Sequence, residues 1–476
     1  AGGRRWFDIA FNTTPDDTGR LVVAARDITH QKRSEEQAIW TAQHDALTGL
    51  PNRLLLQQSL DDILARTDAE MTSAMLILDV DNFKLINDTV GHDGGDALLC
   101  AFAERLRRAV HVDDLVARTG GDEFALLINA QSNADIERVV ERIYDQLRAP
   151  LDHGGRLIEC CASIGASLMP RDGRGRSEIM KAADIALYAA KTNGRAQLRI
   201  FEAEMMESFN QHQTMLASAR FALHGEGIVP FYQPKLSLRT SQVVGFEALL
   251  RWTDRDGRVR TPAGLHAAFD DPALSAPISD MMLDKVLDDV ARWQQSGLEF
   301  GHVAINVTGA DFRRGSFAER IIESLIKRNL PPWAVQIEVT ENVFLGHGTQ
   351  DVDRALKALS DHGIRIALDD FGTGYASLSH LTQFPVDLLK IDRSFIEKIG
   401  YDADAEAITS TVVNLGHCLG LEVVAEGIET RAQQAFLQQI GCDTAQGFLY
   451  SMAVPAEAVP GYLTQSCATE HYAIVG

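Results

Sequence analysis

The strongest constraint on this chain is a stretch in which an apolar run stops at two adjacent carboxylates. The run Ile366-Ala367-Leu368 is followed by Asp369-Asp370 and then by the glycine-rich loop Phe371-Gly372-Thr373-Gly374-Tyr375. Side chains alternate along a strand, so adjacent acids cannot both face one core, and glycine lets a backbone or a ligand approach closely. Such a strand end suits metal ions and phosphate, although an Asx-type turn at the end of a strand would use the same residues.

Length, composition and charge narrow the class of protein. At 476 residues the chain is long enough for two or three domains, and 45% hydrophobic with 23% charged residues is typical of globular proteins. The formal charge of -21 argues against nucleic-acid binding, which requires clustered Lys and Arg. No signal peptide is recognisable, and no apolar run approaches the ~18 residues that a membrane span needs. We therefore expect a cytoplasmic location, with membrane attachment only through a segment upstream of Ala1.

The cysteines and histidines do not suggest a metal site of the zinc type. The 6 cysteines show neither C-x-x-C spacing nor a disulfide-dense pattern, and the 14 histidines form no H-E-x-x-H motif. We expect the cysteines to be reduced packing residues.

Residues 1–30 contain two strand-like runs joined by a turn rich in Thr, Pro, Asp and Gly. Their closing Arg26-Asp27-Ile28-Thr29, followed by a charged helical stretch, resembles the last hairpin of a PAS sensor domain. We expect residues 1–30 to be the C-terminal remnant of such a sensor and residues 31–44 to form a signalling helix. A merely solvated linker is the alternative for the helix.

An alternation of helices and strands follows, and it predicts a sheet covered by helices over residues 45–202. The predicted hairpin at 115–128 turns at Gly120-Gly121 and continues into Asp122-Glu123, and the predicted strand at 73–80 ends at Asp79-Val80. If these strand ends are neighbours, Asp79, Asp122 and Glu123 converge as hard oxygen ligands. Magnesium with nucleotide phosphates fits such ligands better than zinc does.

Three strings in this region resemble those of the GGDEF diguanylate cyclases: Asp45 to Arg53, Asp79 to Asp96 and Gly120 to Phe124. The resemblance spans about residues 40–202 and implies a cyclase-like α/β sandwich that binds GTP and condenses two GTP into cyclic di-GMP, with one or two Mg²⁺ or Mn²⁺ ions per site. It implies metal ligation by Asp79, the Val80 carbonyl, Asp122 and Glu123, the last two also being catalytic. It implies substrate contacts from Lys84, Asn87, Asp96, Gly120, Gly121, Lys191 and Arg195. Because the product is symmetric, two such domains must face each other, so we expect a homodimer.

One departure from that family concerns product inhibition. Such cyclases often carry an inhibitory R-x-x-D site before the glycine turn, and here the spacing gives His111-Val112-Asp113-Asp114. A histidine cannot reproduce the bidentate fork of a guanidinium. We therefore expect a degenerate site at His111 and Asp114, with weak or absent product inhibition.

Beyond a helical linker at 203–224, the pattern repeats strand, loop and helix. Strands are expected at 228–236, 243–252, 303–307, 335–340, 364–370, 386–391, 421–425 and 444–450. Eight strands over about 240 residues are typical of a TIM-type (β/α)8 barrel, whose active sites gather at the C-terminal strand ends. The prediction is a barrel at 225–465 followed by a tail at 466–476.

Nearly every predicted barrel strand ends in a carboxylate, an amide or an amine. In order, these are Glu247, Asn306, Glu338 with Glu341, Asp369 with Asp370, Lys390 with Asp392, Glu426 with Glu429, and Gln446. Any one of them could cap a helix or lie on the surface, but that explanation is weak for the whole set. Converging carboxylates would not stay ionised together without cations. Two divalent metals ~4 Å apart remove the repulsion and are a common device for phosphodiester cleavage.

Residues 213–465 resemble the EAL phosphodiesterases, with the named motif intact as Glu247-Ala248-Leu249. Further matching strings are Gln233-Pro234, Asn306-Val307-Thr308, Glu338 to Glu341, Asp369 to Leu378, Lys390-Ile391-Asp392, Ala425 to Glu429 and Gln446-Gly447-Phe448. The resemblance implies hydrolysis of cyclic di-GMP to linear pGpG with two Mg²⁺ or Mn²⁺ ions.

The same resemblance assigns roles. One metal would be held by Glu247, Asn306, Glu338 and Asp369, and the second by Asp369, Asp370 and Glu426. The catalytic residues would be Glu247, Asp370 and Lys390, with Lys390 orienting or deprotonating the attacking water. Arg251 would grip a phosphate and Glu341 would brace the loop after Asp370. The remaining substrate-binding residues would be Gln233, Asp392, Glu429 and Gln446.

Making and destroying one messenger in one chain requires regulation. We expect phosphodiesterase activity to dominate, with the GGDEF domain binding GTP and either regulating the barrel or synthesising the messenger. Two alternatives stay open: a net diguanylate cyclase, and a non-catalytic receptor for GTP or cyclic di-GMP.

Overall fold

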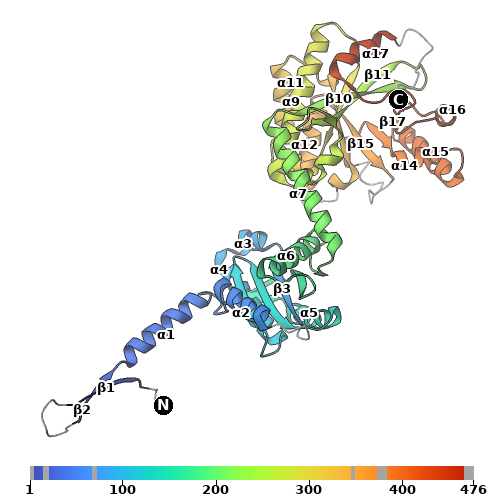
Figure 1. The fold of residues 1–476 in the computed structure, drawn as a ribbon. Helices are drawn as coiled ribbons and strands as arrows, with labels where there is room; N and C mark the ends of the chain where they lie inside the picture. The colour runs from blue at the N-terminus through green and yellow to red at the C-terminus, as the bar shows by residue number, and fades with distance from the viewer. Residues whose placement is uncertain (1–4, 14–20, 67–71, 345–348, 373–382, 466–476) are drawn as a thin grey trace. The chain divides into compact units, whose positions relative to one another are not determined.

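The computed structural model describes residues 5–13, 21–66, 72–344, 349–372 and 383–465. The predicted tail and most of the glycine-rich loop after Asp370 lie outside these residues. The chain divides into two compact units, Ala1–Gln211 and His212–Gly476 (Figure 1). In the described part of the chain, no helix combines the length and the apolar character that crossing a bilayer requires.

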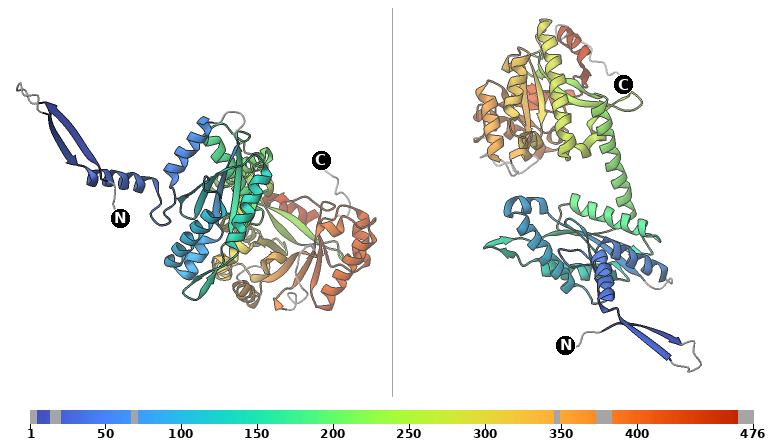
Figure 2. Two further views of the ribbon diagram at one scale, coloured as in Figure 1. Left: turned by 90° about the horizontal axis from the view of Figure 1, so that it is seen from below. Right: turned by 90° about the vertical axis from the view of Figure 1, so that its left-hand side faces the viewer.

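The N-terminal segment forms the expected strands and helix. Strands β1 (Phe7–Thr13) and β2 (Leu21–Asp27) pair antiparallel as a two-stranded ribbon, visible in Figure 2, and helix α1 (Thr29–Gln43) follows. Helix α1 has no buried residue, and the side chains of Ile39 and Trp40 on it are exposed. The assignment of residues 1–30 to a PAS remnant stays a prediction.

The rest of the first unit is one sheet with helices on both faces. The sheet has five strands in the order β4-β5-β3-β8-β9. The strands are β3 (Ser73–Val80), β4 (Leu115–Gly120), β5 (Glu123–Asn129), β8 (Ala162–Met169) and β9 (Leu198–Ile200), with a separate ribbon of β6 (Leu151–His153) and β7 (Arg156–Ile158). The helices are α2 (Arg53–Arg66), α3 (Phe83–Val90), α4 (His92–Ala109), α5 (Asn133–Leu147) and α6 (Arg176–Thr192).

The alternation of side chains along β3 explains the two helical layers. Leu76 and Leu78 pack into one core with Phe102 of α4, whereas Met75 and Ile77 pack into another. Both faces of this central strand are apolar, so each face needs a cover of helices. Strands β7 and β8 are separate because Glu159 to Cys161 between them adopt no regular structure.

In the second unit, eight strands close into a barrel surrounded by helices (Figure 2). The ring runs β11-β13-β14-β15-β16-β17-β18-β10, and β10 pairs with β11 to close it. The strands are β10 (Ile228–Ser237), β11 (Val243–Thr253), β13 (His302–Val307), β14 (Val335–Thr340), β15 (Arg365–Phe371), β16 (Leu388–Ile391), β17 (Glu422–Ala425) and β18 (Thr444–Ala445); β12 (Val259–Arg260) and β19 (Val454–Pro455) extend it. The helices are α7 (Ala203–His224), which enters from the first unit, α8 (His266–Phe269), α9 (Pro272–Gln295), α10 (Gly309–Arg313), α11 (Phe317–Lys327), α12 (Thr349–Asp361), α14 (Arg393–Ile396), α15 (Ala403–Cys418), α16 (Arg431–Gln439) and α17 (Val459–Gln465).

Two details differ from a regular barrel of eight parallel strands. Strand β10 runs antiparallel to both of its neighbours in the ring, because a short hairpin connects it to β11. The predicted strand at 444–450 is wrong beyond Ala445. There the chain turns, since the Tyr450 nitrogen donates to the Gly447 carbonyl at 3.1 Å. It also passes so close to the loop after β17 that a Cβ on Gly447 would lie 2.2 Å from the Ile428 nitrogen.

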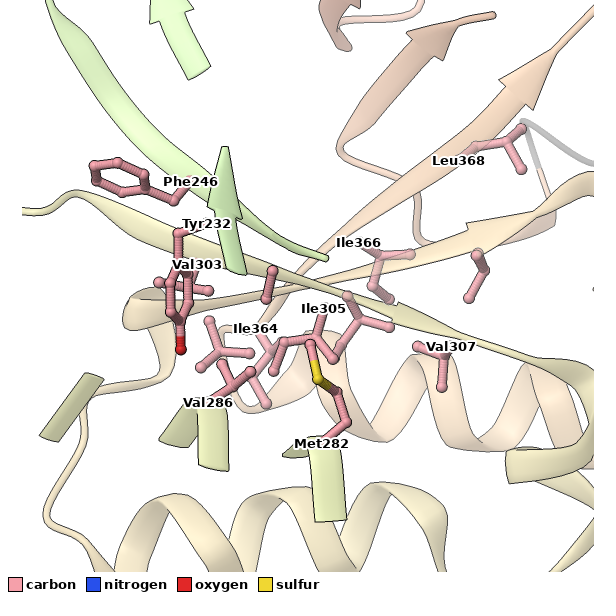
Figure 3. Close-up of a cluster of buried hydrophobic side chains, with 14 of the residues drawn as sticks. Tyr232, Phe246, Met282, Val286, Val303, Ile305, Val307, Ile364, Ile366 and Leu368 are labelled. Carbon is pink, nitrogen blue, oxygen red and sulfur yellow. The ribbon is translucent and has the colours of Figure 1, made fainter. Parts of the chain in front are cut away.

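The main core of the second unit lies between the strands and the outer helices. Figure 3 shows Val303 and Ile305 of β13 facing Met282 and Val286 of α9. Residues on the other face of the same strands therefore point into the barrel, because side chains alternate along a strand.

Replacing Gly165 by Ala should destabilise the first unit. Gly165 lies in β8 under α6, and a Cβ there would come within 2.1 Å of the Leu187 nitrogen and 2.3 Å of the Ala183 carbonyl oxygen. Because backbone atoms cannot move aside as a side chain can, we expect Gly165→Ala to lower the free energy of unfolding by about 3 kcal/mol or more. Chemical denaturation measures this.

Gly175→Ala is the matched control. Its Cβ would have only the Glu178 carboxylate at 4.0 Å, and its φ of -125° suits any residue. We expect a loss of about 1 kcal/mol or less there. Equal losses at the two positions would contradict the packing of α6 on β8.

Candidate functional site

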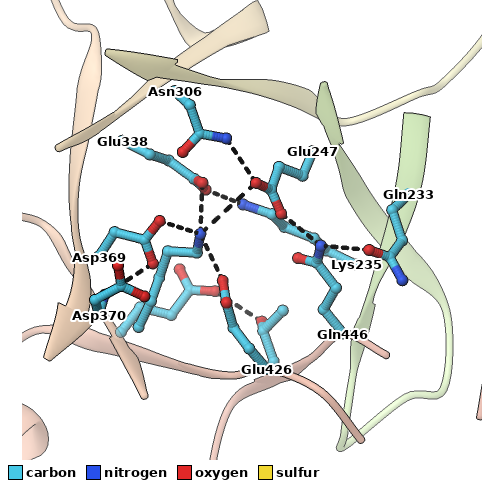
Figure 4. Close-up of polar contacts among 12 residues, drawn as sticks. Gln233, Lys235, Glu247, Asn306, Glu338, Asp369, Asp370, Glu426 and Gln446 are labelled. Carbon is cyan, nitrogen blue, oxygen red and sulfur yellow. Dashed lines mark hydrogen bonds and ion pairs between the residues drawn. The ribbon is translucent and has the colours of Figure 1, made fainter. Parts of the chain in front are cut away.

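The C-terminal ends of the barrel strands bring the predicted polar side chains together. Asn306 of β13 pairs in register with Glu338 of β14, and Asp369 ends the inward-facing row of β15. Glu426 and Gln446 directly follow β17 and β18. Figure 4 shows these side chains pointing toward one another from different strands. The structure thus gathers the predicted set at one end of the barrel.

The ammonium group of Lys390 lies at the meeting point of the carboxylates. Its Nζ is 2.5 Å from Glu338 Oε2, 2.5 Å from Glu426 Oε1 and 3.1 Å from Asp369 Oδ2, with Glu247 Oε1 at 4.0 Å. The Lys390 side chain is only 1% exposed. This buried ammonium therefore offsets part of the repulsion among acids that come from four separate strands or the residues directly after them.

Amide groups hold the carboxylate of the EAL motif. Asn306 Nδ2 donates to Glu247 Oε1 at 2.7 Å, and Gln446 Nε2 donates to Glu247 Oε2 at 2.5 Å. The same Gln446 nitrogen lies 3.0 Å from Gln233 Oε1 (Figure 4). In this arrangement Gln233 and Gln446 orient Glu247, whereas the sequence suggested only substrate contacts for them.

A second buried lysine was not among the predicted site residues. Lys235 of β10 is 1% exposed, and its Nζ lies 2.5 Å from Glu338 Oε1. The sequence offered one signal, which is that Lys235 shares the inward-facing row of β10 with Gln233 two residues earlier.

The strand end with paired acids is bent. Asp370 has a left-handed φ of 56°, and its backbone nitrogen donates to Asp369 Oδ1 at 2.9 Å. Glu341 accepts a bond from the Gly372 nitrogen at 3.0 Å, as expected for a residue that braces this loop. Adjacent side chains in a regular strand point to opposite faces, and the left-handed turn at Asp370 removes this alternation for the carboxylates of Asp369 and Asp370.

Three predicted substrate contacts engage other protein groups. Asp392 caps α14 by accepting from the Ser394 nitrogen at 3.0 Å. Glu429 pairs with Arg393 at 3.0 Å. Arg251 donates to the Leu250 carbonyl at 2.8 Å and lies over the Phe231 ring. Their roles toward a substrate stay predictions.

The buried cluster shifts its own proton affinities. Burial, with Asp369 and Glu247 nearby, raises the pKa of Glu426 to about 8, and burial with Asp369 and Asp392 raises the pKa of Asp370 to about 6. Burial also disfavours ionised Glu338, but the ammonium groups of Lys235 and Lys390 outweigh it and lower its pKa to about 2. Burial opposes the charge of Lys390 as well, yet the surrounding carboxylates raise its pKa well above the ordinary value. Lys390 therefore keeps its proton in this arrangement.

The donor chemistry of the barrel site fits a hard divalent cation. Carboxylate and amide oxygens from Glu247, Asn306, Glu338, Asp369 and Glu426 are the ligand types that Mg²⁺ and Mn²⁺ prefer. Among the described residues no cluster of His, Cys, Asp and Glu already has the arrangement of a formed metal site. The reason is visible in the contacts, because Glu338, Asp369 and Glu426 are turned onto Lys390. Divalent cations would have to displace that ammonium from the acids.

The first unit brings its predicted acids together as well. Asp79 of β3 is opposite Glu123 of β5 in register, and the Val80 nitrogen donates to the Asp122 carbonyl at 3.2 Å. Lys191 of α6 lies 2.6 Å from Asp79 Oδ2. Burial raises the pKa of Asp79, against the opposing effect of Lys191.

Arg118 fixes the glycine turn beside these acids. Gly121 has a left-handed φ of 54°, and its carbonyl accepts bonds of 3.0 Å and 2.6 Å from the Arg118 guanidinium. Arg118 also pairs with Asp45 at 2.9 Å. Around Gly120 and Gly121 no atom lies within 4 Å of an added Cβ, so a ligand can approach this backbone.

The predicted nucleotide contacts lie on two segments near β3. The first segment is α3, which carries Asn87, together with the start of α4, which carries Gly95 and Asp96. A Cβ on Gly95 would lie 2.0 Å from Asn87 Oδ1, so a glycine at this position leaves room for the Asn87 amide. Lys84 and Asp96 are exposed.

Asp81 supports the other segment, which carries Arg195. Its buried carboxylate accepts from Ser163 Oγ at 2.8 Å and from the Ala196 nitrogen at 3.0 Å. The sequence analysis gave Asp81 no role, because both partners are far away along the chain.

The degenerate inhibitory pair contacts its own backbone. Asp114 accepts from the His111 nitrogen at 2.8 Å and from the Asn129 nitrogen at 3.3 Å. Its carboxylate therefore already stabilises the local turn.

Comparisons with known proteins match both units. The family model for the EAL domain matches residues 216–453, and that for the diguanylate cyclase GGDEF domain matches residues 42–197. A protein of Pseudomonas aeruginosa named bifunctional diguanylate cyclase/cyclic di-GMP phosphodiesterase MucR is 37% identical over 90% of this chain and 63% of its own length. The Escherichia coli cyclic di-GMP phosphodiesterase PdeR is 31% identical over 92% of this chain and 66% of its own length. The chain thus spans less than two thirds of each of these relatives.

A solved structure supports the fold. The EAL enzyme Bd1971, in its form bound to cAMP and cyclic di-GMP, superposes with a TM-score of 0.52 at 23% identity, covering 72% of this chain and 81% of that one. Both family models match, and the matched residues include the barrel site and the glycine turn. This chain therefore belongs to the EAL domain family and carries a GGDEF domain in tandem before the barrel.

Proposed function

We propose that the barrel hydrolyses cyclic di-GMP to linear pGpG with the help of two divalent cations. The observation that carries this proposal is the convergence of carboxylates from four strand ends on one buried ammonium. The names of MucR and PdeR support the choice of substrate.

We assign the residues of the barrel site different roles in the proposed reaction. The metal ligands would be Glu247, Asn306, Glu338, Asp369, Asp370 and Glu426. When bound, the cations would stabilise negative charge on the attacking and leaving oxygens of an in-line displacement. Asp370, whose backbone nitrogen is bonded to the Asp369 carboxylate at this end of the barrel, is the acid to which we assign acceptance of the proton from the attacking water. Lys390 contacts three of the proposed ligands, so we assign it the role of orienting or deprotonating the attacking water beside the cations.

For the first unit we propose GTP binding and the condensation of two GTP to cyclic di-GMP when two copies face each other. The neighbouring Asp79, Asp122 and Glu123 support cation binding there, and the open backbone at Gly120 and Gly121 leaves room for phosphates. Lys191 stands beside Asp79 as a counter-charge. A homodimer is part of this proposal because the product is symmetric.

Product analysis tests the two activities separately. The protein is incubated with Mn²⁺ and either cyclic di-GMP or GTP, and products are resolved by chromatography. Glu247→Ala removes a carboxylate held by two amides, so we expect pGpG formation to fall by about a thousandfold or more. Asp122→Ala should leave hydrolysis within about twofold while abolishing synthesis.

Other outcomes of the same assay decide between the alternatives. Unchanged hydrolysis in Glu247→Ala would refute the proposed role of the barrel. Net accumulation of cyclic di-GMP from GTP in the wild type would favour a net cyclase. Binding of both nucleotides without turnover of either would favour a receptor.

The raised pKa values predict that cation binding to the barrel depends on pH. The pKa of Glu426 is about 8 and that of Asp370 about 6, so both bind protons that a cation must displace. We expect Mn²⁺ affinity to rise about tenfold or more between pH 6 and pH 8.5, because the acids lose these protons over that range. Electron paramagnetic resonance of free Mn²⁺ measures it, in a chain carrying Asp79→Asn and Asp122→Asn so that only the barrel binds.

Glu426→Gln is the control for this pH dependence. The amide cannot titrate, so the variant should bind more weakly but with a flatter pH profile. A wild-type affinity that does not change with pH would contradict the assignment of Glu426 to the metal site.

We also expect the pair His111 and Asp114 not to bind the product tightly. Neither side chain supplies a guanidinium fork, and Asp114 already accepts backbone bonds. The test is a calorimetric titration with cyclic di-GMP of two chains, one carrying Glu247→Ala and one carrying Glu247→Ala together with Asp114→Ala. We expect the two chains to bind cyclic di-GMP equally. Tight binding lost in Asp114→Ala would show that the inhibitory site is intact.

A further inference from the structure

Lys235 and Lys390 contact the two oxygens of the same carboxylate. Lys235 lies 2.5 Å from Glu338 Oε1, and Lys390 lies 2.5 Å from Glu338 Oε2. Both lysines are 1% exposed, and the Glu338 side chain is 0% exposed. A buried ammonium is costly to desolvate and persists only with a charged partner. Both lysines are therefore held in the barrel by acids.

The partners of the two lysines differ. Lys390 also pairs with Asp369 and Glu426, which are proposed cation ligands, so an incoming cation must compete with it. Lys235 pairs with Glu338 through Oε1, whereas Lys390 pairs with the other oxygen, Oε2. A cation can therefore take the place of the Lys390 ammonium while Lys235 stays on Glu338.

We propose that Lys235 is the permanent counter-ion of Glu338, a positioning residue that holds this carboxylate by one oxygen and limits how strongly the barrel attracts divalent cations. The inference rests on the proposed metal-dependent function. It adds that the affinity for the cations is set from β10, the antiparallel strand, by a residue outside the ligand set.

The charge balance gives the direction of the effect. Removing Lys235 makes the site more negative by one charge within a buried region, where charges interact strongly, so divalent cations should bind more tightly. Removing the charge of Glu338 instead leaves the Lys235 ammonium unpaired beside the cation, and binding should weaken. Removing both charges should restore part of the affinity that the loss of Glu338 costs. A lysine that only fills space would produce neither the tightening nor the restoration.

The test is a Mn²⁺ titration by electron paramagnetic resonance on the full chain carrying Asp79→Asn and Asp122→Asn. Lys235→Met keeps the length of the side chain and removes its charge, and we expect it to lower the Kd about tenfold. Glu338→Gln should raise the Kd. The double variant Lys235→Met/Glu338→Gln should bind more tightly than Glu338→Gln alone.

Controls separate the possible failures. Lys357→Met removes a surface ion pair of 2.8 Å with Asp353 on α12 and should leave the Kd unchanged. Thermal unfolding checks each variant, and Lys235→Gln replaces Lys235→Met should the latter not fold. An unchanged or weaker affinity in the folded Lys235 variant, or a double variant that binds no better than Glu338→Gln, would overturn the role of Lys235. A wild-type barrel that binds no Mn²⁺ would overturn the proposed function together with this inference.

Discussion

The arrangement of the acids in the barrel depends on a buried ammonium that lies among them. Glu338, Asp369 and Glu426 come from separate strands and would repel one another without Lys390 among them. Replacing such a cluster by apolar residues is often neutral or stabilising in proteins, so the cluster is weak as a stability device. Its composition of carboxylates and ammonium groups instead supports the proposal that cations bind at this end of the barrel.

In both units a sheet brings acids together and a lysine partly offsets their charge, but the strands are arranged differently. In the barrel, parallel strands carry acids to a common end, and β10 inserts Lys235 from the opposite direction. In the GGDEF unit, the antiparallel pairing of β3 with β5 places Asp79 opposite Glu123, with Lys191 of α6 beside them. In each case the sheet supplies the acids and a lysine partly offsets their charge.

Much of this was predictable from the sequence, for identifiable reasons. Strands such as β3 and β14 have apolar residues between clear polar boundaries, and their predicted bounds match the structure. The convergence of the proposed barrel ligands was predictable because most of them stand near the C-terminal end of a strand or directly after it. The sequence could not show that Lys390 would lie among the acids, that Gln446 would bond to Glu247, or that Asp81 would hold the Ala196 backbone, because these contacts join residues far apart in the chain. The predicted end of β18 was wrong because the chain turns after Ala445, where the Gly447 carbonyl accepts a bond from the Tyr450 nitrogen.

The central claim is that divalent cations take the place of the Lys390 ammonium among the barrel acids. Anomalous diffraction from crystals of the protein soaked in Mn²⁺ tests it most directly. The account predicts manganese peaks bounded by Glu247, Glu338, Asp369 and Glu426, with Lys390 Nζ withdrawn from Glu338 Oε2 and Lys235 still on Oε1. Absence of manganese from this end of the barrel, with Lys390 still paired to its three acids, would contradict the claim.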